Sequence, residues 1–139
     1  MCLCVLKTNK KTNIMNEFAL LLLAFLAITF LQSGYDKIAD WNGNVSWLKG
    51  HFSQTFLKNQ VPAALLTILA LEIVAGVLSI MGIAENIMSG RTILGDYACV
   101  VSCVTLLLLL FGQRVAKDYD GARTIVIYLI PALLGVYWL

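Results

Sequence analysis

The chain has 139 residues, a formal net charge of +2 and 13% charged side chains, whereas soluble domains average roughly 25%. Hydrophobic residues make up 60% of the chain, and the mean hydropathy is +0.83. This composition excludes an ordinary water-soluble fold and predicts one membrane domain. The small net charge gives no indication of nucleic-acid binding. The sequence also lacks the glycine-rich loop that would indicate nucleotide binding.

The N-terminal residues carry Lys7, Lys10 and Lys11 ahead of the first apolar stretch. We expect residues 1–16 to form a tail and residues 17–139 to form the membrane domain. A signal peptide is the alternative, but no A-x-A cleavage site follows the apolar stretch. Met15 is a second possible start of translation, because a helix could begin directly there.

Four uncharged stretches predict the membrane spans, at about residues 18–35, 61–84, 93–113 and 124–139. None shows the period-2 alternation of a barrel strand. Because a backbone in lipid must satisfy its own hydrogen bonds, the stretches predict helices. The expected fold is therefore all-α, an integral membrane four-helix bundle.

The last stretch is short, about 24 Å at about 1.5 Å per residue. Tyr137 and Trp138 are expected at the membrane interface at its far end. Pro131 is expected to bend this span, because proline lacks an N–H and its ring crowds the carbonyl of Ile127.

The connection between the first two spans contains an apolar stripe with three- and four-residue spacing, formed by Trp41, Val45, Leu48, Phe52 and Phe56. This pattern predicts an amphipathic interfacial helix over residues 41–56, with Asn44 or Ser46 as N-cap. Such a helix either shields the ends of the bundle or covers a ligand cavity.

Other polar or reactive groups receive structural interpretations. The charged segment 113–123 is expected to be a solvated turn closed by Gly121. Cys99 and Cys103 are expected to pack between helices as small apolar residues. The chain has one histidine, His51, and its cysteines lack the spacing of a zinc site, so no metal site is expected.

Glu72 is the most informative residue, because it lies in the middle of the apolar stretch 61–84. A carboxyl group at that depth marks a functional site or a polar junction between helices. Small residues on the same helix face, Gly76 and Ser79 among them, predict that Glu72 points into the bundle.

Basic residues lie near the span ends, so we expect Glu72 to have no Lys or Arg partner and to be an uncharged acid. Its expected hydrogen-bond partners lie at similar depth on other spans: Thr29, Ser102, Thr105 and Tyr128. The alternative interpretation is a proton-handling or ligand-binding group.

Four features recur in an order and spacing known from one family: Ser33-Gly34-Tyr35-Asp36-Lys37 as a turn after the first span, Pro62 at the start of the second, Glu72 followed by Gly76 within it, and Gly90-Arg91-Thr92 before the third. On these features, residues 18–139 resemble the DoxX family of membrane proteins. The resemblance implies a four-helix bundle in the bacterial inner membrane, with Arg91 and both termini in the cytoplasm.

The distribution of basic residues points to the opposite orientation. One side of the membrane would hold Lys7, Lys10, Lys11 and Arg91, and the other Lys37, Lys49, Lys58, Arg114, Lys117 and Arg123. The positive-inside rule alone would place the second set, and the loop 36–60, in the cytoplasm. The orientation stays open at this point.

The resemblance also bears on function, since the family takes its name from a subunit of a thiosulfate:quinone oxidoreductase. It implies an accessory subunit that binds a quinone or another lipid-like molecule and works with a redox partner protein. Glu72 would accept a proton, Tyr35, Trp41 and Trp47 would line the mouth of the site, and Lys37 and Arg91 are further candidates.

Two other functions remain under consideration. In the first, the chain is a non-enzymatic membrane protein that acts in assembly, lipid handling or stress tolerance, and Glu72 is a structural junction between helices. A proton-coupled transporter is disfavoured, because the sequence shows neither repeats nor broken helices. No catalytic residue is assigned, and no cofactor other than a quinone is suggested.

Overall fold

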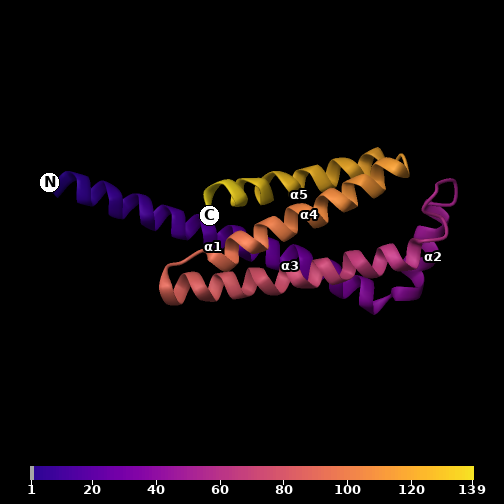
Figure 1. Ribbon diagram of the computed structural model, residues 1–139, viewed down its shortest axis with the longest axis horizontal. Coiled ribbons are helices and arrows are strands. Elements are labelled where there is room, and N and C mark those ends of the chain that lie inside the picture. Colours follow the sequence, from indigo (N-terminus) through magenta and orange to yellow (C-terminus); the bar gives the residue numbers. More distant parts are fainter. Residues whose placement is uncertain (1) are drawn as a thin grey trace.

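The computed structural model describes the backbone of residues 2–139 and the side chains of residues 13–139. Its helices are α1 (Cys2–Ala39), α2 (Trp41–His51), α3 (Val61–Ser89), α4 (Ile93–Val115) and α5 (Tyr119–Trp138) (Figure 1). Four of them contain a segment long and apolar enough to cross a membrane. The all-α four-span prediction is therefore confirmed, and the protein is a multi-pass membrane protein in contact with the lipid bilayer.

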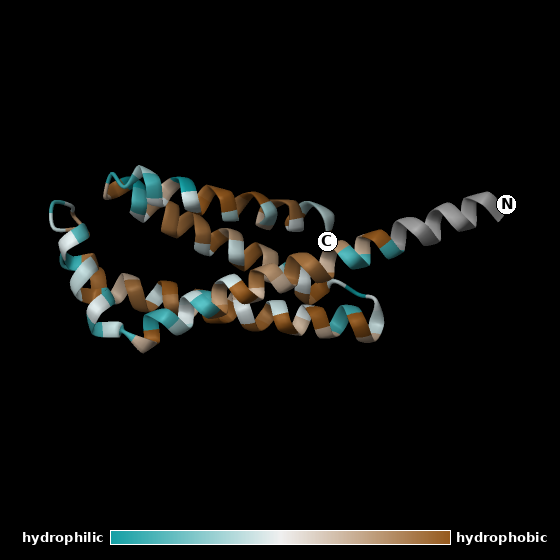
Figure 2. Ribbon diagram, turned by 180° about the vertical axis from the view of Figure 1, so that it is seen from behind, coloured by the Kyte–Doolittle hydropathy of each residue, from teal (hydrophilic) through white to brown (hydrophobic). Residues whose placement is uncertain are grey.

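The four long helices pack as neighbours in chain order, α1 along α3, α3 along α4 and α4 along α5. The N-terminal end of α1, the α3–α4 connection and the C-terminus share one end of the bundle, and α2 lies at the other (Figure 1). Apolar residues dominate the middle of the helices, and hydrophilic residues gather around α2 and the α4–α5 turn (Figure 2). This distribution is the one expected for a bundle embedded in lipid.

Small residues allow the helices to approach closely at the end opposite α2. A Cβ added at Gly82 of α3 would lie 2.8 Å from the backbone nitrogen of Gly95 in α4. A Cβ added at Gly135 of α5 would likewise overlap Sγ of Cys99. Cys99 and Cys103 are buried free thiols that belong to the apolar core. Their predicted packing role is confirmed.

The helix boundaries differ from the expected ones in α1. The helix is continuous from Cys2 to Ala39, so the residues assigned to an N-terminal tail are helical and run directly into the span. The prediction of a turn over residues 33–37 is wrong, because these residues form the last turns of the same helix. Nothing in this segment forces a break, since its single glycine, Gly34, packs against Leu69 and Ile73 of α3.

The last span also begins earlier than expected, at Tyr119. Asp118 is its N-cap, and its carboxylate accepts a hydrogen bond of 2.9 Å from the N–H of Gly121. The turn before it is short and uses a positive φ of 59° at Lys117. Gly121 therefore lies in the first turn of α5 and does not close the loop. The helix is continuous across Pro131, and the bend expected there stays a prediction.

The amphipathic helix is confirmed in position but is shorter than predicted. It begins after Asp40, whose carboxylate accepts from the N–H of Gly43 at 3.2 Å, and it ends at His51. The predicted N-caps Asn44 and Ser46 are wrong. After His51 the chain continues in turns. In these turns the hydroxyl of Thr55 donates a hydrogen bond of 2.9 Å to the carbonyl of Phe52.

Gly82→Ala tests the close approach of α3 and α4. The added methyl group has no room beside the backbone of Gly95, so we expect a loss of about 1–3 kcal/mol in stability. The loss will appear as a lower unfolding temperature in detergent. Gly50→Ala is the matched control, because no atom lies within 4 Å of its Cβ position and alanine suits a helix interior better than glycine. Equal unfolding temperatures for the two variants would contradict the close contact.

Candidate functional site

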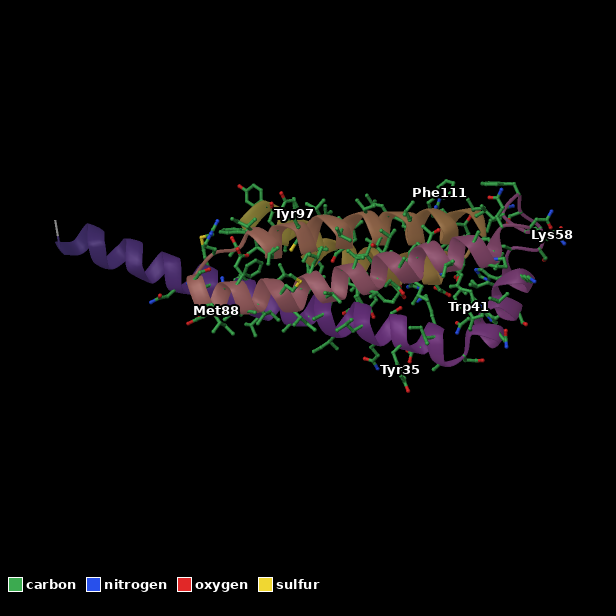
Figure 3. All side chains as sticks on the ribbon, turned by 60° about the horizontal axis from the view of Figure 1, so that its bottom comes forward. Tyr35, Trp41, Lys58, Met88, Tyr97 and Phe111 are labelled. Carbon is green, nitrogen blue, oxygen red and sulfur yellow. The ribbon has the colours of Figure 1, made fainter. Side chains whose placement is uncertain are left out.

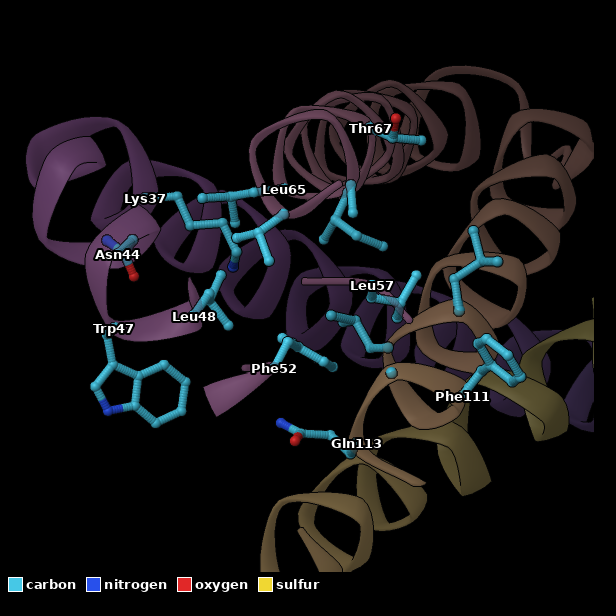
Figure 4. Close-up of a pocket in the computed structure, with 16 residues that line it drawn as sticks. Lys37, Asn44, Trp47, Leu48, Phe52, Leu57, Leu65, Thr67, Phe111 and Gln113 are labelled. Carbon is cyan, nitrogen blue, oxygen red and sulfur yellow. The ribbon is translucent and has the colours of Figure 1, made fainter. Parts of the chain in front are cut away.

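A cavity of about 460 Å³ lies where the α4–α5 pair and α3 diverge, at the α2 end of the bundle (Figures 1 and 4). Its volume falls within the roughly 300–1,000 Å³ of small-molecule sites. Its walls are mainly apolar side chains from three helices and from the turns after α2. A cavity of this size and lining is suited to a lipid-like molecule.

One wall of the cavity is α2 with the turns that follow it, which contribute Trp47, Leu48 and Phe52. The facing walls are the first two turns of α3 and the last turns of α4. Several lining residues on α3 and α4 are also exposed on the outer surface, among them Thr67 and Phe111. Part of the cavity lining therefore lies on the outer surface of two helices that are long and apolar enough to cross a membrane.

Lys37 lies on the cavity wall beside Leu48 and Leu65 (Figure 4). Its Nζ atom lies 3.0 Å from both carboxylate oxygens of Glu72 and donates a hydrogen bond to Oε1. The same Nζ atom donates to the hydroxyl of Ser33 at 2.7 Å, and that hydroxyl donates to Oε1 of Glu72 at 3.0 Å. The three residues form a closed network between α1 and α3.

The geometry of this network follows from helical spacing. Ser33 and Lys37 are four residues apart on α1, so they share the face that packs on α3. Glu72 is 1% exposed, and Gly76, one turn further along α3, lies against Leu31. The predicted inward orientation of Glu72 is confirmed.

The expectation that Glu72 has no basic partner is wrong. That expectation assumed that the first span ends at Tyr35. In the structure α1 continues to Ala39 and carries Lys37 inside the bundle. The side chain of a helical residue points back toward the N-terminus of its helix, so the side chain of Lys37 runs along α1 toward the level of Glu72. A long lysine side chain at the end of α1 can therefore reach Glu72.

The hydrogen-bond partners expected for Glu72 are also wrong. The hydroxyls of Thr29, Ser102 and Thr105 donate to carbonyls four residues earlier in their own helices, as hydroxyl side chains in membrane helices commonly do. Tyr128 packs its ring beside Phe25. The group that replaces them is Ser33, which the spacing to Lys37 could have indicated.

The structure brings together three of the six site residues that the sequence suggested. Lys37 and Glu72 form the ion pair, and Trp47 lines the cavity. Tyr35 and Trp41 do not line it, and Tyr35 points away from the bundle (Figure 3). Arg91 is exposed in the α3–α4 connection at the other end of the bundle.

A second polar cluster, which sequence reasoning missed, connects α2 to the α4–α5 turn. His51 Nε2 lies 3.3 Å from Oε1 of Gln113 and 3.7 Å from Oδ2 of Asp118. The imidazole ring stacks on Trp47 with centroids 4.6 Å apart. Since Gln113 and Trp47 both line the cavity, this cluster holds one wall of the cavity against another.

The described side chains that line the cavity offer groups that can recognise a ligand. No nucleophile adjacent to a general base is present among the described lining side chains. The cavity offers a large apolar surface, a lysine that is itself ion-paired, and two amide side chains, Asn44 and Gln113. Comparison of the chain with protein-family models, with curated proteins and with solved structures finds no match.

The ion pair can be tested by a double-mutant cycle with Glu72→Leu and Lys37→Met. Removing one partner leaves a buried charge without its counter-charge, which costs roughly 3–5 kcal/mol, whereas replacing both with apolar residues is often tolerated. We therefore expect each single variant to unfold at a lower temperature than the double variant. Additive effects of the two substitutions would contradict a direct pair.

His51→Ala tests the contact between α2 and the α4–α5 turn. Loss of a hydrogen bond worth about 1 kcal/mol should make the amides of α2 exchange with solvent several-fold faster. Hydrogen exchange read by mass spectrometry provides the measurement. Lys49→Ala is the matched control on the same helix, because Lys49 is exposed and does not line the cavity. If both variants exchange alike, His51 does not restrain α2.

Proposed function

We propose that this protein binds a lipid-like molecule dissolved in the membrane and holds it in the cavity beneath α2. The observation that carries the proposal is the mainly apolar cavity of about 460 Å³ whose lining includes two helices long and apolar enough to cross a membrane. A ligand of this kind would enter from the bilayer without crossing water. The cavity wall formed by α2 would separate the bound molecule from the aqueous phase.

A quinone in a membrane redox system is the more specific form of this proposal. Its support is the resemblance of residues 18–139 to DoxX proteins, together with the size and apolar lining of the cavity. In this form of the proposal a redox partner protein would supply the electrons. Lys37 and the amide of Gln113 are the groups that could donate hydrogen bonds to quinone carbonyls.

A non-enzymatic role in assembly, lipid handling or stress tolerance is the second candidate. The network of Lys37, Glu72 and Ser33 favours it, because all three groups are already paired with one another. In that case the buried acid would serve to align α1 with α3. The two candidates share the cavity and differ in whether its ligand undergoes electron transfer.

Ala64→Phe tests whether the cavity is the binding site. Ala64 lines the cavity, and a phenyl ring there would occupy the space of the ligand. We expect binding of a benzoquinone with a decyl tail to weaken about tenfold or more, the factor that about 1.4 kcal/mol produces. Quenching of Trp47 fluorescence in nanodiscs, in a background with Trp41→Phe and Trp138→Phe, provides the measurement.

Ala63→Phe is the control for this experiment. Ala63 is the preceding residue on α3, is exposed, and does not line the cavity, so its substitution should leave binding unchanged. If the quinone fails to bind but lipid extracted with the purified protein is displaced by Ala64→Phe alone, the cavity binds lipid and the redox form of the proposal is wrong. If neither molecule is bound, the proposed function is wrong.

A further inference from the structure

The charges around the cavity are distributed unevenly. Among the described side chains that line it, Lys37 is the only charged one. Its partner Glu72 lies behind it, away from the lining, with a side chain 2% exposed against 18% for Lys37. A ligand in the cavity would therefore meet the positive member of the ion pair.

The other polar side chains of the lining already make hydrogen bonds within the protein. The amide nitrogen of Asn44 donates to the carbonyl of Asp40 at 2.7 Å, and the hydroxyl of Thr67 donates to the carbonyl of Ala63 at 2.9 Å. The far wall is apolar at Leu108, Leu109 and Phe111. The amide oxygen of Gln113, next to them, lies 3.3 Å from Nε2 of His51. The cavity thus has one cationic end and one hydrocarbon end, which is the polarity of a single-chain amphiphile with an acidic head.

We infer that the ligand of this cavity is a long-chain monocarboxylic acid, which enters as the neutral acid and gives its proton to Glu72. This inference rests on the proposed function of the cavity and names its ligand class. Glu72 does not line the cavity, so Lys37 relays the proton. Nζ of Lys37 gives one proton to the carboxylate of Glu72, 3.0 Å away, where an O–H bond forms, and Nζ takes the proton of the ligand as the O–H bond of the ligand breaks. Nζ of Lys37 then pairs with the carboxylate of the ligand, so the site keeps one positive and one negative charge throughout.

Conservation of charge is the reason why a monocarboxylic acid fits better than other amphiphiles. An anion that arrived without its proton would face Glu72 as a second negative charge in a low-dielectric site, which is costly. A phosphate monoester carries up to two negative charges, one more than Lys37 can neutralise. A neutral ester or quinone can accept a hydrogen bond from Lys37, but it brings no negative charge with which the ammonium group could form a new ion pair.

The first experiment compares palmitic acid with its methyl ester in nanodiscs. In the wild-type protein we expect the acid to bind at least about tenfold more tightly than the ester, because its carboxylate forms a hydrogen bond between two charged groups that the ester cannot form. Lys37→Met should abolish this preference, so that acid and ester bind equally, and measurable binding of the ester will show that the variant folds. Lys37→Arg should retain it, and Lys49→Met, which alters a lysine outside the cavity, should have no effect.

The second experiment follows the proton by infrared difference spectroscopy with palmitic acid labelled with ¹³C at the carboxyl carbon. Bound ligand should give carboxylate bands, shifted by the label, while an unlabelled carboxylic-acid band appears from Glu72. Glu72→Gln should remove that second band. A ligand that stays protonated, or a Glu72 that stays ionised, would overturn the inference.

The outcomes distinguish a failure of the ligand class from a failure of the proposed function of the cavity. Equal binding of acid and ester, both lost in Ala64→Phe, would overturn the acid as ligand and leave the cavity as a binding site for neutral lipids. Binding of neither molecule would overturn the proposed function together with the inference. A preference for the acid that survives in Lys37→Met would also overturn the inference, because the head group would then bind elsewhere.

Discussion

A charge within a membrane protein persists only where a partner and hydrogen bonds offset the hydration that it loses. In this chain that condition is met between Lys37 and Glu72, with Ser33 donating to the same carboxylate oxygen. The pair requires α1 to remain helical to Ala39 and to lie along α3. It therefore fixes the relation of two spans, and it places the amino group of Lys37 on the cavity wall.

The cavity depends on a second constraint, the uneven spacing of the helices. Glycine contacts such as Gly82 with Gly95 bring α3 and α4 together near the C-terminus. At the opposite end the helices diverge, and α2 with Phe52 fills part of the gap (Figure 4). His51 joins this wall to Gln113 and Asp118. The remaining space is apolar because lipid-facing helices supply most of its lining.

Four spans and a short helix between the first two could be predicted from the sequence, because long apolar stretches and helical periodicity are local signals. The inward face of Glu72 could also be predicted, from Gly76 and Ser79. The partner of Glu72 could not be predicted, because Lys37 was assigned to a loop and the pairing depends on how far α1 extends relative to α3. The same limit applies to His51, whose contact with Gln113 joins residues distant in the sequence. The cavity follows from helix divergence, which no local pattern records.

The arrangement of α1 and α3 and the position of Lys37 on the cavity wall depend on the proximity of Lys37 and Glu72 in a bilayer. Solid-state NMR on protein labelled with ¹⁵N at lysine side chains and ¹³C at glutamate carboxylates can detect it through dipolar coupling. The structure predicts a coupling that corresponds to direct hydrogen bonding, with 3.0 Å between Nζ and either carboxylate oxygen, and its loss in Glu72→Gln. No coupling, or one that persists in Glu72→Gln, would contradict the ion pair and the arrangement of α1 and α3 derived from it.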